Sequence, residues 1–187
     1  MALQLAPGVS FDEVNHKYFY KGKQLSGVTG LVSKKLGLKY DNAFVGEYAE
    51  EGIHVHKAIQ EFINTGHTES VHPGVRWLVD AWHYADVAAG TGAPKYSEVL
   101  VSDFKQYASA VDIVEKGPDG NLRIFDVKNG RFKRDYATWQ LSIYKYFIEK
   151  VGMVVDECLC ISLRDQDEYK IFPKPVEEVE KLLYGSN

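Results

Sequence analysis

Residues 107–128 read YASAVDIVEKGPDGNLRIFDVK, and this stretch decides the fold. Two runs rich in apolar and β-branched residues, 107–114 and 122–127, flank the segment 117–121. That segment consists of glycine, proline, aspartate and asparagine, which favour a turn. The pattern therefore predicts two antiparallel strands joined as a hairpin.

The register of this hairpin brings charged residues together. Counting outward equally from Asp119 sets Asp112 opposite Asp126. Opposed side chains of an antiparallel pair have Cβ atoms about 5 Å apart, so two aspartates there repel each other unless a cation lies between them. Asp126 and Lys128 are separated by one residue, so both side chains point to one face while Val127 points to the other layer. The hairpin thus predicts a divalent metal beside a lysine.

The predicted metal site offers carboxylate oxygens in small number and leaves positions for water and phosphate. Such a site suits Mg²⁺ or Mn²⁺ better than Zn²⁺ or Ca²⁺. A metal of this kind polarises a phosphate and lowers the pKa of a bound water, and a neighbouring lysine neutralises developing charge. We therefore expect metal-assisted hydrolysis of phosphodiester bonds. From Asp-Val-Lys alone an alternative stays open, namely a surface hairpin with solvated ion pairs.

The elements around the hairpin follow from the spacing of apolar residues. Helices are predicted where these residues recur every three or four positions, and strands where they alternate. We expect a three-layer α/β fold with a mixed central sheet flanked by helices and the hairpin at its middle. The other expected elements are a hairpin within 9–23, a helix from Asp41 or Asn42 to 64–66, a helix from Pro73 that ends by Gly90, a strand at 96–101, a helix at 135–150, strands at 157–163 and 169–172, and a helix at 175–183.

The composition is that of an ordinary globular protein. The chain has 187 residues, 45% of them hydrophobic, so we expect a single domain over 1–187. Its net charge of -4 means that a polyanionic partner must be held by a local basic surface or by bound metal. No apolar run approaches the roughly 20 residues that span a bilayer, and no signal-peptide pattern is found. We expect a cytoplasmic protein without a membrane partner.

Four motifs lie in order on the predicted elements. They are Gly52-Ile53-His54-Val55-His56 on the first long helix, Ala110-Val111-Asp112 and Asp126-Val127-Lys128 on the hairpin, and Gln140-Leu141-Ser142-Ile143-Tyr144 on the next helix. Over residues 9–163 this arrangement resembles the RecB-like exonuclease branch of the PD-(D/E)XK nuclease superfamily. The resemblance implies a restriction-endonuclease-like core. The chain departs from it where Glu51 replaces a common arginine and Ala110 a common glycine.

The resemblance implies roles for the matched residues. The residues implied to be catalytic are Asp112, Asp126, Lys128 and Gln140. The residues implied to hold the metal are His56, Glu98, Asp112, Asp126 and Val127. For the outer carboxylate, Asp103 is an alternative to Glu98. His54 diverges from His56 on the helix, and we expect it to be a surface or packing residue.

Contacts with DNA are expected from the loop and helix that follow the hairpin. Arg131 and Lys133 belong to a basic loop next to the predicted metal, where they are expected to hold phosphates. Gln140 and Tyr144 are four residues apart and share a helix face. The resemblance implies that Gln140 steadies Lys128 or a phosphate and that Tyr144 contacts nucleic acid. The alternative for Tyr144 is a packing role only.

The expected activity is that of a Mg²⁺- or Mn²⁺-dependent deoxyribonuclease. The resemblance favours an exonuclease on single-stranded or frayed DNA ends, acting in recombination, replication or repair in a prokaryote or phage. Two alternatives stay open, a structure-selective endonuclease and a non-catalytic nucleic-acid-binding module. The only cysteines, Cys158 and Cys160, alternate on an apolar run and are expected to be buried strand residues. Since an iron–sulfur cluster takes four cysteines, none is expected.

Overall fold

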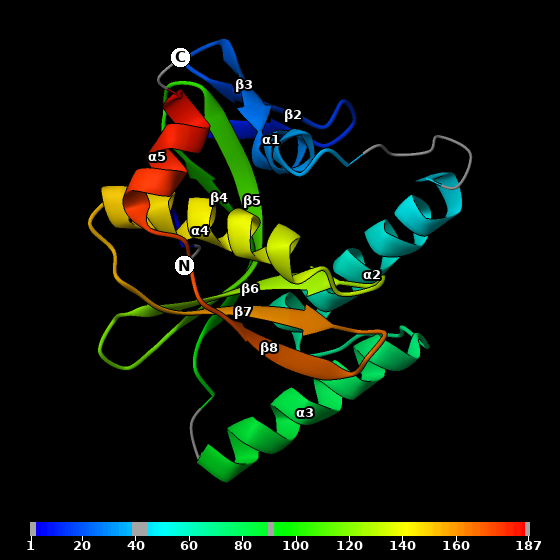
Figure 1. Cartoon of the computed structure of the whole chain (residues 1–187). Coiled ribbons are helices and arrows are strands. Elements are labelled where there is room, and N and C mark those ends of the chain that lie inside the picture. The colour runs from blue at the N-terminus through cyan, green and yellow to red at the C-terminus, as the bar shows by residue number, and fades with distance from the viewer. Residues whose placement is uncertain (1–2, 39–44, 90–91, 186–187) are drawn as a thin grey trace.

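The structure is a computed structural model that describes residues 3–38, 45–89 and 92–185. Figure 1 shows them as a sheet with helices packed against it. In chain order the elements are β1 Val9–Asp12, β2 Lys17–Tyr20, β3 Lys23–Gly27, α1 Val28–Lys35, α2 Val45–Thr65, α3 Pro73–Ala89, β4 Lys95–Ser102, β5 Tyr107–Lys116, β6 Leu122–Lys128, α4 Arg134–Lys150, β7 Val155–Ser162, β8 Asp167–Ile171 and α5 Val176–Tyr184. The predicted N-cap, Asp41 or Asn42, and the predicted stop at Gly90 lie outside the described residues.

The eight strands of these described residues form one mixed sheet. β3 pairs with β5 and β6 with β7 in parallel, and the other neighbours are antiparallel. β5 is the centre of the sheet because it has three neighbours. β4 runs along one edge of it, whereas β3 pairs with its start and β6 with its end. The mixed sheet expected from the sequence is confirmed.

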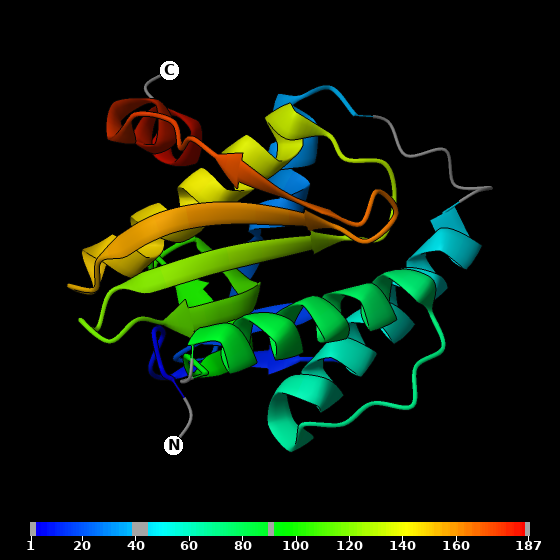
Figure 2. The same cartoon turned by 90° about the horizontal axis from the view of Figure 1, so that it is seen from below.

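Helices cover both faces of the sheet, as the view in Figure 2 shows. One core cluster joins α1, α4 and α5 to the sheet through buried residues such as Val28, Ile143 and Val179. A second cluster joins α2 and α3 to the other face through Val55 and Val75. Side chains alternate along a strand, so successive residues of β6 enter different clusters. The predicted three-layer α/β fold is confirmed.

The β5–β6 hairpin has the predicted register. Ile113 pairs with Phe125, and the same count continued by one residue sets Asp112 level with Asp126. The turn between the strands contains Gly120 at a φ of +88°, a conformation that glycine adopts readily. The turn residues and the apolar pattern together were therefore sufficient to fix which charged residues lie at one level.

The amino-terminal region contains more structure than the sequence predicted. The hairpin of β1 and β2 is confirmed, with Phe11 paired to Tyr18. β3 and α1 follow it and were not predicted, because α1 begins with valine, threonine and glycine, which are weak helix formers. Packing stabilises this helix instead, since Val28 and Val32 are both fully buried.

The two cysteines are buried side chains of β7, as predicted. Burial raises the pKa of the Cys158 thiol to about 12, and it also raises the pKa of Cys160. Both thiols are therefore protonated and inert at neutral pH. Among the helices of the described residues, none combines the length and the apolar character needed to cross a membrane.

Candidate active site

The candidate site lies where β6 separates from β5. The backbone pairing of these strands stops at Ile113 and Phe125. At the next residue of β5, a side chain takes the place of a backbone acceptor. The Oδ2 of Asp112 accepts the backbone N–H of Val127 at 2.6 Å. β3 pairs only with the first two residues of β5. Within the described chain, residues 109–111 thus have no strand partner on this edge, and side chains of other elements gather there.

Three side chains from different elements converge at this point, and we call them the acidic cluster. His56 of α2, Glu98 of β4 and Asp112 of β5 each offer a ligand atom, and these atoms lie within 4.8 Å of one another. His56 Nδ1 is 3.5 Å from Glu98 Oε1 and 3.6 Å from Asp112 Oδ1. The side chains are 13% to 36% exposed, so water reaches them. Asp103, the alternative to Glu98, instead accepts three backbone N–H groups of its own turn.

The charges of the acidic cluster are only partly balanced. The Asp112 carboxylate raises the pKa of His56 to about 9, so the imidazole is protonated at neutral pH. Burial raises the pKa of Asp112, and Glu98 adds to this effect. One imidazolium therefore faces two carboxyl groups. A divalent cation fits this donor set by replacing the proton on His56, since a metal binds the neutral imidazole.

Glu98 has a strained backbone. Its φ of +51° lies in the left-handed region, which costs a residue with a side chain about 1–2 kcal/mol. Of the described non-glycine residues with positive φ, only Glu98 lies within a strand. Strain of this kind persists where the surroundings enforce it and is common at functional sites. Here it accompanies a carboxylate that lies beside His56.

A second set of charged groups lies on the α4 side of the sheet. Asp126 has no exposed surface, and its Oδ1 accepts a hydrogen bond from Lys128 Nζ at 2.8 Å. Lys128 Nζ also donates to Gln140 Oε1 at 3.1 Å. Burial raises the pKa of Asp126 to about 6. Burial alone would lower the pKa of Lys128, but the Asp126 and Asp112 carboxylates outweigh it and raise that pKa. The ammonium is therefore charged and held at two points.

The hydrogen bonds continue from Gln140 to β5. Gln140 Nε2 donates to the Tyr144 hydroxyl at 2.6 Å, and that hydroxyl lies 3.0 Å from Ser109 Oγ. An ammonium can only donate, so Gln140 turns its carbonyl to Lys128 and its amide to Tyr144. The Tyr144 hydroxyl accepts that bond and shares a second hydrogen bond with the Ser109 hydroxyl. We call this chain, from Asp126 and Lys128 to Ser109, the lysine network.

The predicted contact of Tyr144 with nucleic acid is wrong. Only 1% of the residue is exposed, and it belongs to the core cluster beneath α4. A ring that is buried on both faces cannot stack on a base. The alternative role in packing is correct, and the hydroxyl belongs to the lysine network. Ser109 was missed, since a serine within an apolar strand carries no signal of its own.

The residues predicted to hold the metal divide between two sets. Among the described residues, Asp126 is not grouped with the acidic cluster, and its Oδ1 accepts a hydrogen bond from Lys128. The Val127 side chain packs in the α2 and α3 layer, as its position predicted. Only the main chain of Val127 is therefore available to the site. His54 is exposed, as expected.

A pocket beside Lys128 is lined by basic residues. It has a volume of about 250 Å³, and its walls are formed by Leu38, Lys128, Gly130, Arg131, Lys133 and Tyr136. No carboxylate is among these described lining residues. Arg131 and Lys133, which were predicted to hold phosphates, are exposed here. The pocket therefore has the charge that attracts an anion.

Three comparisons relate this chain to known proteins. No protein-family model matches the sequence, and no curated protein matches it. Among solved structures, one described as "Crystal structure of SSO0001" is similar at 16% sequence identity, with 90% of this chain and 80% of that chain covered and a TM-score of 0.40. The function of the chain is therefore inferred from the residues of its site.

Proposed function

We propose that this protein is a Mg²⁺- or Mn²⁺-dependent nuclease that hydrolyses phosphodiester bonds of DNA. The observation that carries the proposal is the convergence of His56, Glu98 and Asp112 within 4.8 Å. The same hairpin that holds Asp112 also holds Lys128, a charged lysine fixed by Asp126. Two carboxylates and an imidazole, all partly exposed, suit a divalent cation that keeps positions for water and phosphate.

Each part of the site has a separate role in this proposal. Bound at the acidic cluster, the cation would act as a Lewis acid that polarises a phosphate and lowers the pKa of a bound water. Lys128 neutralises the charge that develops on the phosphate, and Asp126 and Gln140 keep its ammonium in position before substrate arrives. The rest of the lysine network holds Gln140 in the orientation that Lys128 requires.

The proposed substrate is DNA with a free single-stranded or frayed end, as in recombination, replication or repair. The pocket with Arg131 and Lys133 supports a polyanionic substrate despite the net charge of -4. Its volume of about 250 Å³ is below the range of about 300–1,000 Å³ that takes a drug-sized ligand. A phosphate of the DNA backbone fits a pocket of this size.

The test uses DNA substrates that differ only in their ends. End-labelled single-stranded DNA, end-labelled duplex and covalently closed circular DNA are incubated with Mg²⁺, Mn²⁺ or a chelator. We expect nucleotides to be released from linear single-stranded DNA with either metal, and no cleavage of the circle or with the chelator. Cleavage of the circle would assign a structure-selective endonuclease, and binding without cleavage in any metal would assign a binding module.

A further inference from the structure

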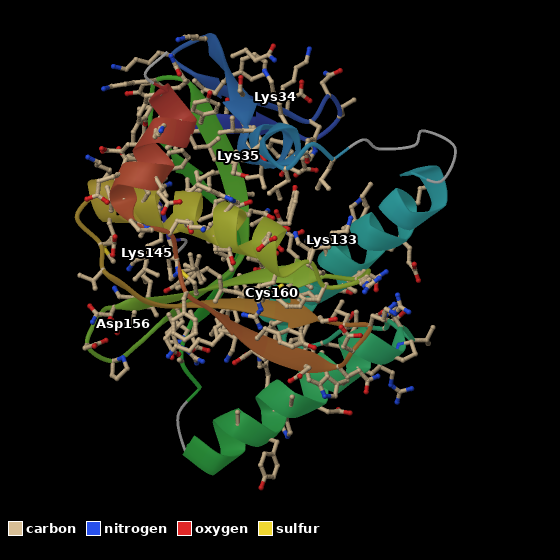
Figure 3. All side chains as sticks on the ribbon, in the orientation of Figure 1. Lys34, Lys35, Lys133, Lys145, Asp156 and Cys160 are labelled. Atoms are coloured by element: carbon tan, nitrogen blue, oxygen red, sulfur yellow. The ribbon has the colours of Figure 1, made fainter. Side chains whose placement is uncertain are left out.

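Helix α1, which the sequence did not predict, presents two exposed lysines close to the candidate site. Lys34 and Lys35 form its last turn. Neither makes an ion pair with a carboxylate in the part of the chain that the structure describes. By contrast, two lysines toward the carboxyl end of α4 form ion pairs, Lys145 with Glu149 and Lys150 with Glu180. Figure 3 shows Lys34 and Lys35 on α1 and Lys133 at the start of α4.

Contacts at both ends of α1 hold this helix against α4 and beside the basic pocket. Lys35 Nζ lies 5.4 Å from the centre of the Trp139 ring, a cation–π distance. Tyr136, which lines the pocket, donates its hydroxyl to Thr29 O at 3.4 Å. Leu38, three residues after the helix, lines the same pocket as Lys128. The lysines of α1 are therefore held next to the pocket wall.

The charge of this region is opposite to that of the whole chain. Residues 3–38 contain five lysines and two carboxylates, Asp12 and Glu13, which gives a net charge of +3. The full chain has a net charge of -4. A polyanion that the chain as a whole repels weakly is thus attracted by this region, whose Leu38 borders the pocket lined by Arg131 and Lys133.

We propose that Lys34 and Lys35, with Arg131 and Lys133, form a track for the phosphate backbone of a single DNA strand that ends at Lys128. The proposal rests on the proposed nuclease function and adds the path of the strand. Lys34 and Lys35 contact phosphates next to those held in the pocket. A dinucleotide therefore fills the pocket alone, and a longer oligonucleotide also reaches α1.

The experiment measures binding without cleavage, in a chelator, to fluorescent oligothymidylates of about 2 and about 15 nucleotides, of which the longer lies within the site sizes of single-strand binders. The test variant is Lys34→Gln/Lys35→Gln. Its matched control is Lys150→Gln/Lys181→Gln, which removes the same charge at the far end of α4, about 25 Å along a helix of 17 residues, and from α5. We expect the test variant to bind the longer oligonucleotide about tenfold more weakly at low salt.

Salt dependence identifies the contacts. Loss of two phosphate contacts should reduce the slope of log K against log salt by about 1.4 for the longer oligonucleotide. The short oligonucleotide and the control variant should keep the parent slope. Lys34→Arg/Lys35→Arg, which keeps both charges and the cation over Trp139, should bind as the parent does, and this excludes a folding defect.

Two outcomes would overturn the track. One is parent affinity of the Gln variant for the longer oligonucleotide, and the other is an equal loss in the control variant. The proposed nuclease function fails separately, when the parent protein binds DNA but releases no nucleotide in Mg²⁺ or Mn²⁺. In that case an altered salt slope of the Gln variant would still support the track.

Discussion

The acidic cluster and the lysine network meet at the β5–β6 hairpin and differ in how their charges are satisfied. In the acidic cluster, His56 lies 3.5 and 3.6 Å from its two carboxylates, and all three side chains are partly exposed. In the lysine network, the distances run from 2.6 to 3.1 Å. Asp126, Gln140 and Tyr144 in that network are buried.

This difference indicates two physical tasks. A buried network in which each group has a partner is rigid, because breaking one bond leaves a polar group unpaired in the core. Rigidity suits a charge that must be in place before the substrate binds. A group of carboxylates with long contacts gains most from an added cation. The acidic cluster should therefore respond to metal, whereas the lysine network should control stability and turnover.

The largest expected effects separate activity from stability. Asp126→Ala should abolish cleavage and lower the free energy of unfolding by about 3 kcal/mol, because it leaves the Lys128 ammonium without its buried partner. Asp112→Asn should lower cleavage at least about 100-fold. It should change stability little, because it removes both the attraction to the His56 imidazolium and the repulsion from Glu98 and keeps an oxygen for the Val127 N–H. Urea unfolding and nucleotide release measure the two quantities.

The control for this pair is Asp156→Asn, at an exposed aspartate near the start of β7 (Figure 3). It should alter neither quantity. If the Asp126→Ala protein has parent stability, the pair of Asp126 and Lys128 is solvated, and the lysine network is no more rigid than the acidic cluster. Parent activity in Asp112→Asn would remove the acidic cluster from the reaction.

The second expected effect is a metal-dependent rise in melting temperature. At a metal concentration of 100 times Kd the native state gains about 2.7 kcal/mol, which corresponds to roughly 5–10 °C for a chain of this size. Glu98→Gln and Asp112→Asn should blunt the rise, because each removes a carboxylate from the acidic cluster. Asp156→Asn should keep it. Identical melting curves with and without millimolar Mn²⁺ would contradict a metal at this cluster.

The sequence could predict those parts of the site that depend on period and turn chemistry. The turn after β5 fixed the level of Asp112 and Asp126, and the period of two placed Asp126 and Lys128 on one face of the sheet with Val127 on the other. The spacing of Gln140 and Tyr144 placed both side chains on one face of α4, where they bond to each other. These are local rules, and a single sequence is enough to apply them.

The parts that could not be predicted depend on tertiary packing. α1 has weak helix formers in its first turn and is stabilised by burial. Whether the Tyr144 ring is buried depends on how closely α4 packs against the sheet. The spacing of Gln140 and Tyr144 is compatible with a buried ring and with an exposed one. Ser109 and the left-handed backbone of Glu98 follow from where the strands separate. No residue pattern along the chain records that separation.

The third prediction tests the far end of the lysine network. Ser109→Ala should lower kcat about fivefold to tenfold with KM unchanged, since it removes a hydrogen-bond partner of the Tyr144 hydroxyl and one hydrogen bond is worth about 0.5–1.5 kcal/mol. Tyr144→Phe should cause at least that loss, because it also removes the acceptor of Gln140 Nε2. The double variant should lose no more than Tyr144→Phe alone, because both changes break the same bond.

Ser142→Ala is the matched control for Ser109→Ala. Ser142 is also a buried serine, but it lies on α4, and its hydroxyl bonds to the backbone of Thr138 and Lys174. Ser142→Ala should lower the free energy of unfolding and leave kcat unchanged. Additive losses for Ser109→Ala and Tyr144→Phe, or a higher KM with normal kcat, would show that Ser109 does not act through Tyr144.

The smallest expected effect concerns the strained backbone of the acidic cluster. Glu98→Gly and Glu98→Ala both remove the carboxylate, but only glycine adopts a φ of +51° without strain. Relief of about 1–2 kcal/mol of strain exceeds the entropy of about 0.5–1 kcal/mol that glycine loses on folding. The Gly variant should therefore be more stable than the Ala variant by about 0.5–1 kcal/mol, or roughly 1–4 °C in melting temperature. This order is the reverse of the usual one in a strand. Thermal unfolding without metal measures it, and an Ala variant as stable as the Gly variant would mean that Glu98 is not held in strain for the acidic cluster.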